Sequence, residues 1–72
     1  MNRYSMIIQW SDEDELFLIT IPEFADLVMM PCTHGQTRDE AMRNGEEVIE
    51  MYLEAWKAEG EMIPAPSKVE VA

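Results

Sequence analysis

The sequence contains only one cysteine, Cys32, and only one histidine, His34. A single thiol cannot form a disulfide framework within one chain, and one cysteine with one histidine cannot supply the four ligands of a structural zinc site. The two residues could act as nucleophile and base, but the sequence identifies no third residue to orient the imidazole. We therefore interpret Cys32 as a half-buried thiol and His34 as a surface residue before a turn, and we expect no metal and no cofactor.

Basic residues are also scarce. The chain has five, against fifteen acidic residues, which gives a net charge of −10. Proteins bind nucleic acid through clusters of Lys and Arg that displace counterions from phosphates, and here the basic residues are scattered along the chain. We therefore expect no direct binding to nucleic acid. The electrostatic field favours a cationic partner, and the alternative, that the acidity only keeps a small protein soluble, stays open at this point.

Long apolar runs are missing as well. Crossing a bilayer takes roughly 20 consecutive apolar residues, and no stretch of the chain approaches that length. The N-terminal residues Met1–Tyr4 carry one basic residue and lead into no signal-peptide pattern, so we expect a cytoplasmic protein. Residues 1–72 make a single small domain, which buries only about 60% of its unfolded surface. Oligomerisation is the expected reinforcement at this size.

Two segments with the character of β-strands flank a charged turn. In Arg3–Trp10 apolar residues recur at every second position, and Leu16–Ile21 is a short apolar run of β-rich composition. The acidic turn Ser11–Glu15 joins them into a predicted hairpin. Pro22 ends the second strand because it lacks an N–H group, and a third short strand is expected within Leu27–Thr33.

A long helix is predicted between Thr37 and Gly60. Thr37 and Glu40 form a capping box, and Gly60 suits the left-handed residue that ends a helix. Gly45 costs up to about 1 kcal/mol relative to Ala inside a helix, and the close approach of a strand backbone would explain it. At about 100° per residue, one face of the helix collects Ala41, Met42, Gly45, Val48, Ile49, Tyr52, Leu53 and Trp56. Lys68–Val71 alternates and could either pair at a sheet edge or fray. With it as a short last strand, the sequence predicts an α+β domain in the order β-β-β-α-β.

Five separate segments together resemble the HicB family of antitoxins. The most telling is the helix entry His34–Ala41, which is similar to the family pattern x-G-x-T-x-x-E-A. The other segments that carry the resemblance are Tyr4–Trp10, Ile21–Phe24, Met51–Trp56 and Gly60–Ser67. This resemblance implies a partial, degenerate RNase H-like fold: a three-stranded antiparallel sheet, a long helix and a short C-terminal strand.

The resemblance also implies a function. Members of the family commonly neutralise HicA, a small basic toxin that cleaves mRNA. Many carry a C-terminal DNA-binding module, and we expect none in residues 1–72. An RNase H-like nuclease needs carboxylates that converge from its strands, and the predicted strands Arg3–Trp10 and Leu16–Ile21 contain none, so we expect no enzymatic activity. The alternative that stays open is a homo-oligomeric binding or regulatory module with a small ligand or another protein partner.

Two sets of side chains are candidate interaction sites. The acidic set, expected to meet a basic toxin, comprises Asp12, Glu13, Asp14 and Glu15 at the hairpin tip and Glu46, Glu50 and Glu54 along the helix. The tip could instead hold a hard cation, but a continuous acidic run lacks the spacing and the glycine of a calcium loop. The apolar set, expected to join copies of the chain into a dimer or tetramer, comprises Trp10, Phe17, Met29, Met30 and Trp56.

Overall fold

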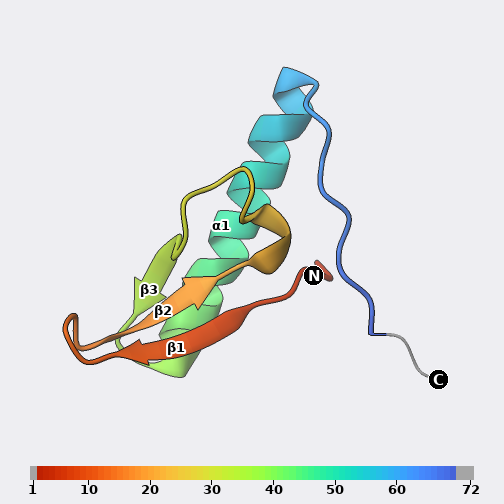
Figure 1. Cartoon of the computed structure of the whole chain (residues 1–72). Coiled ribbons are helices and arrows are strands. Elements are labelled where there is room, and N and C mark those ends of the chain that lie inside the picture. The colour runs from red at the N-terminus through yellow and green to blue at the C-terminus, as the bar shows by residue number, and fades with distance from the viewer. Residues whose placement is uncertain (1, 70–72) are drawn as a thin grey trace.

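A computed structural model describes residues 2–69 as one three-stranded sheet with one long helix against it (Figure 1). The strand order is β1-β2-β3, and both pairs are antiparallel. The elements are β1 (Ile7–Ser11), β2 (Leu16–Thr20), a 3₁₀-helix (Pro22–Phe24), β3 (Thr33–Gly35) and α1 (Arg38–Glu59). The predicted α+β class, the three-stranded antiparallel sheet and the single long helix are confirmed.

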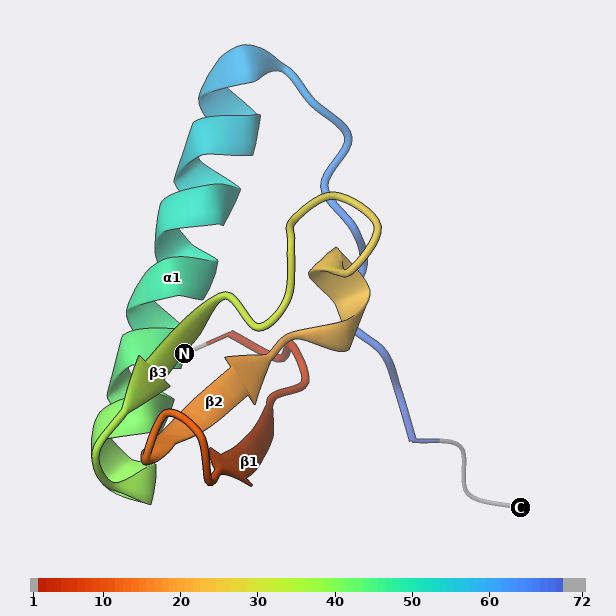
Figure 2. The same cartoon turned by 60° about the vertical axis from the view of Figure 1, so that its left-hand side comes forward.

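Helix α1 covers one face of the sheet, as the two views show (Figures 1 and 2). The core lies between the sheet and α1. Ile19 and Ile21 enter it from β2 and its end, Phe24 from the 3₁₀-helix, and Ala41 and Ile49 from α1, all with 0% exposure. Each large aliphatic or aromatic side chain stabilises the fold by about 1.5–3 kcal/mol relative to an exposed one. So few fully buried residues make a small core, as expected at this chain length.

An aromatic cluster extends this core toward the C-terminal half of α1. The Phe24 ring lies with its centroid 4.8 Å from that of Trp56 and 4.9 Å from that of Tyr4, and Tyr52 stacks on Trp56 at 5.4 Å. Tilted and edge-on contacts at these distances add to the stabilisation that burial alone gives. Phe24 is therefore the residue that joins the N-terminal segment, the 3₁₀-helix and α1.

Both ends of α1 follow the local sequence. The Thr37 hydroxyl accepts a hydrogen bond from the Glu40 backbone N–H at 3.0 Å, and the Glu40 carboxylate accepts one from the Gln36 backbone N–H at 2.9 Å. The carboxylate thus reaches one residue further back than in the standard capping box. Gly60 ends the helix with φ 73°, in the left-handed region that glycine occupies without strain. The predicted helix boundaries are confirmed.

Position 45 holds a glycine for a steric reason. A Cβ at this position would lie 2.8 Å from the Sδ and Cε atoms of Met6 and 3.3 Å from Cγ2 of Ile19. The expected close approach is therefore real, but side chains make it rather than a strand backbone. On the predicted apolar stripe Met42 is 46% exposed, because it lies at the border of the face that α1 turns toward the sheet.

Two strand predictions need correction. The first strand begins at Ile7 rather than Arg3, because the backbone N–H groups of Tyr4 and Ser5 bind the side chains of Asn2 and Glu23 instead of a neighbouring strand. Residues 27–30 form no strand. The backbone N–H groups of Leu27 and Val28 both bond the Phe24 carbonyl, so the chain continues as a turn and β3 starts only at Thr33.

The segment after α1 carries no strand within the described residues. Lys68 and Val69 have no regular secondary structure, while Glu70 and Val71, the rest of the predicted last strand, lie outside the described residues. The segment nevertheless lies against the body of the domain (Figure 2). The Tyr4 hydroxyl donates a hydrogen bond to the Pro64 carbonyl, and the Ser67 backbone N–H donates one to the Glu23 carboxylate.

Candidate interaction surface

The acidic hairpin tip is fully exposed and locally ordered. All four of its residues, Asp12 to Glu15, are solvent-exposed turn residues between β1 and β2. The Trp10 indole N–H donates to Asp12 at 2.9 Å, and the Ser11 hydroxyl donates to the Asp14 carboxylate at 3.0 Å. These bonds position the Asp12 and Asp14 carboxylates within an exposed cluster of four acidic side chains.

The acidic row on α1 is shorter than the sequence predicts. Glu50 and Glu54 are exposed, but Glu46 is half-buried and accepts a hydrogen bond from the Asn2 side-chain amide at 2.6 Å. The expectation of full exposure is wrong at Glu46, because the N-terminal segment packs over this turn of the helix. Of the three predicted carboxylates, Glu50 and Glu54 therefore remain exposed.

The two acidic groups lie at different ends of the domain. The loop between β1 and β2 is at the end where α1 begins, as both views show, whereas Glu50 and Glu54 belong to the second half of α1 (Figures 1 and 2). A small partner therefore meets either the tip or the helix face first.

The apolar candidates divide into two groups. Trp10 is 51% exposed and Met29 is 89% exposed, as a contact surface requires. Phe17, Met30 and Trp56 are half-buried and pack against the core instead. Arg38 covers the Phe17 ring at 4.8 Å from its centroid, and Trp56 belongs to the aromatic cluster around Phe24.

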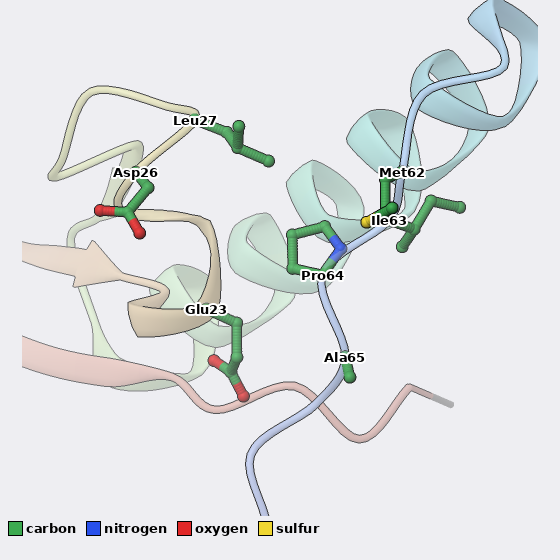
Figure 3. Close-up of a pocket in the computed structure, with 7 residues that line it drawn as sticks. All are labelled: Glu23, Asp26, Leu27, Met62, Ile63, Pro64 and Ala65. Carbon is green, nitrogen blue, oxygen red and sulfur yellow. The ribbon is translucent and has the colours of Figure 1, made fainter.

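A groove runs between the 3₁₀-helix region and the C-terminal segment (Figure 3). It encloses about 540 Å³ and is lined by Glu23, Asp26, Leu27, Met62, Ile63, Pro64 and Ala65. Leu27 is 58% exposed and Met62 is 91% exposed. The sequence analysis missed these residues, although apolar side chains beyond the helix end at Gly60 were a signal that could have been followed. The charged side chains that line the groove are Glu23 and Asp26.

Glu23 holds three parts of the chain together beside this groove. Its carboxylate accepts hydrogen bonds from the Ser5 backbone N–H at 3.0 Å and from the Ser67 backbone N–H at 2.9 Å. Partial burial opposes ionisation, but the donors at Ser67 and Ser5 outweigh it and lower the pKa of Glu23 below its ordinary value. The charged carboxylate is therefore the form that ties the N-terminal and C-terminal segments to the 3₁₀-helix.

Cys32 and His34 differ in their surroundings. The Cys32 thiol is half-buried with its sulfur 3.7 Å from the Ile19 carbonyl oxygen, and burial raises the pKa of the thiol. His34 is exposed on β3, opposite Leu18. Within residues 2–69 no group of three His, Cys, Asp or Glu side chains is placed to hold a metal ion. The same residues include no helix long and apolar enough to span a membrane.

Comparison with known proteins identifies the family. The model of the HicB-like antitoxin of bacterial toxin–antitoxin systems matches residues 4–72. The chain belongs to the HicB-like antitoxin family. A curated relative, the UPF0150 protein Ta0767 of Thermoplasma acidophilum, is 32% identical over 69 residues, which cover 96% of this chain and 93% of the relative. No solved structure matches significantly, so the RNase H-like fold stays a prediction. Membership of the HicB-like antitoxin family implies a role in a toxin–antitoxin system and a toxin partner.

Proposed function

We propose that this HicB-like chain is a cytoplasmic antitoxin that binds and neutralises a small basic toxin of the HicA-like, mRNA-cleaving kind. The observation that carries the proposal is the net charge of −10 in a member of an antitoxin family. A toxin that binds RNA needs a cationic surface, and an acidic protein of this size can cover such a surface. The chain acts by binding, so it needs no catalytic group of its own.

The exposed acidic side chains supply the contacts in this proposal. The hairpin tip places four carboxylates within one turn, and Glu50 and Glu54 stand one helical turn apart on α1. Like charges at this spacing repel each other by a few tenths of a kcal/mol, and a basic partner removes that repulsion. Complementary potentials raise the association rate more than they slow dissociation.

The test starts from the reading frames that flank that of this chain. A flanking frame that encodes a small basic protein supplies the candidate toxin. Expression of the basic protein alone should arrest growth, and co-expression of this chain should restore it. The two purified proteins should form a complex. Growth arrest that persists, together with no complex in solution, would show that the chain is not the antitoxin of that protein.

Charge-reversal variants then locate the docking face. Reversing Asp12 to Glu15 to Lys, or separately Glu50 and Glu54, should slow association, and the loss should shrink as salt screens the charges. The matched control reverses Glu59 and Glu61, two exposed residues at the end of α1, and changes the net charge by the same amount as the helix pair. A control that slows association equally would reduce the effect to net charge.

The groove beside Glu23 favours a second candidate function. Its volume of about 540 Å³ falls within the range of small-molecule sites. The alternative to toxin neutralisation is a homo-oligomeric regulatory module. Its groove would bind a small cation with apolar substituents. Chemical-shift changes confined to Leu27, Met62 and Ile63 on titration with an alkylammonium ion, in a chain that fails the toxin test, would favour it.

A further inference from the structure

The strands differ from the rest of the chain in charge. None of the residues in β1, β2 or β3 is Asp, Glu, Lys or Arg, whereas such residues make up 28% of the whole sequence. β1 is an edge strand, since it pairs only with β2. Proteins usually protect edge strands with Lys, Pro or a bulge, and β1 contains neither residue and pairs with β2 without interruption.

The free backbone groups of β1 belong to Ile8 and Trp10. The Ile19 carbonyl accepts from the Cys32 N–H on the β3 side, so Leu18 and Thr20 direct their backbone groups to β1. The backbone groups of their partners Gln9 and Ile7 therefore bond to β2. The backbone groups of Ile8 and Trp10, which alternate with them, point away from β2. Outside the β1–β2 ladder, no hydrogen bond within residues 2–69 involves the backbone N–H or C=O group of Ile8 or Trp10.

We propose that the β1 edge pairs with β1 of a second copy of this chain, antiparallel and about a two-fold axis at Gln9. In this register Ile8 of each copy exchanges backbone hydrogen bonds with Trp10 of the other, and the two Gln9 residues face each other as a non-hydrogen-bonded pair. The product is a continuous six-stranded sheet with both α1 helices on the same face.

Two features of the structure favour a second copy as the occupant. Trp10 lies on the helix side of the sheet with half of its surface exposed, and Ile8 of the partner would cover it. The register also directs the acidic hairpin tip of each copy toward the N-terminal segment of the other, which carries the exposed Arg3. An uncharged edge is cheap to desolvate, so the acidic surface elsewhere does not prevent pairing at this edge.

Charge at Gln9 tests the register. Wild-type protein should sediment at micromolar concentration as a dimer of the 8.3 kDa chain. Gln9→Glu and Gln9→Lys should each weaken their homodimer by about fivefold, because like charges then face each other across the axis. An equal mixture of the two variants should form heterodimers in preference to either homodimer. Gln36, exposed in the turn before α1, supplies the control: Gln36→Glu and Gln36→Lys should leave dimerisation unchanged.

A cross-link provides a second readout. Cα atoms of a non-hydrogen-bonded pair lie about 4.5 Å apart, within the span of a disulfide, so Gln9→Cys in a Cys32→Ala background should form an intermolecular disulfide on mild oxidation. The same background with Gln36→Cys should not form one. A wild-type chain that stays monomeric, or a dimer unaffected by charge at Gln9, overturns the proposal. A monomer whose toxin binding weakens in both Gln9 variants would instead assign the edge to a toxin strand.

Discussion

Replacing Glu23 with Gln tests the contact that holds the C-terminal segment in place. Gln keeps the size of the side chain but loses the charge and one of the two oxygens that accept hydrogen bonds from Ser5 and Ser67. Bonds to a charged acceptor are worth about 1.5–3 kcal/mol each, and partial exposure places these at the lower end. We expect Glu23→Gln to reduce the free energy of unfolding by about 1–2 kcal/mol. In a domain this small that lowers the Tm by roughly 5–15 °C.

The loss should depend on pH in a defined direction. Because the folded-state pKa of Glu23 is lowered, its contribution is fully present above the ordinary carboxyl pKa and disappears as the pH falls through the folded-state value. Wild type and Glu23→Gln should therefore differ at neutral pH and converge in acid, as followed by circular dichroism during thermal unfolding. Protection of the Ser67 amide from hydrogen exchange should fall in parallel.

A matched carboxylate separates this contact from a general charge effect. Glu61 is exposed on the same C-terminal segment, immediately after the end of α1. Glu61→Gln should leave the stability unchanged or raise it slightly, because a negative charge is unfavourable at a helix C-terminus. Equal stability of Glu23→Gln and wild type at neutral pH, or a difference that stays constant down to acid pH, would refute the assigned role of Glu23.

Other substitutions follow from the packing. Gly35→Ala should destabilise the fold by more than about 2 kcal/mol, because its Cβ would lie 2.3 Å from the Ala41 backbone nitrogen; Gly45→Ala should cost less, because it meets a flexible methionine side chain and gains helix propensity of about 1 kcal/mol. Urea unfolding measures both, and equal losses would contradict the geometry. Phe24→Ala should cost about 3–5 kcal/mol and abolish cooperative thermal unfolding. Cys32 should react with iodoacetamide more slowly in the folded protein than in protein unfolded in urea, since burial raises the pKa of its thiol.

The helix could be predicted from sequence because its signals are local. The Thr37 cap and the glycine at position 60 act within a few residues of themselves, and the apolar period of α1 needs only one face to be buried. β3 could not be predicted in the same way. Leu27 and Val28 resemble strand residues, but a turn begun by Pro22 controls their backbone, and only the pairing of β2 with Thr33–Gly35 fixes the third strand.

The candidate surface shows the same division between local and long-range information. The exposure of the hairpin tip follows from its own sequence, since a charged turn has nothing to pack against. The burial of Glu46 does not, because Asn2 reaches it from 44 positions away in the chain. The groove beside Glu23 likewise exists only because residues near position 25 meet residues near position 64. Sequence periodicity carries no information about such contacts.

The two proposed interactions use different physical forces and should respond to salt with opposite signs. Pairing at β1 brings together two chains that each carry a charge of −10, so their overall repulsion opposes the uncharged contact at the edge. Added salt screens that repulsion and should tighten the dimer, whereas it weakens the attraction between the acidic surface and a basic toxin. The β1 edge also leaves Glu50 and Glu54 free, since both lie on α1. A dimer that tightens with salt while toxin association slows would therefore support an uncharged contact at β1 and an electrostatic contact with the toxin, and a dimer that weakens with salt would contradict the uncharged contact.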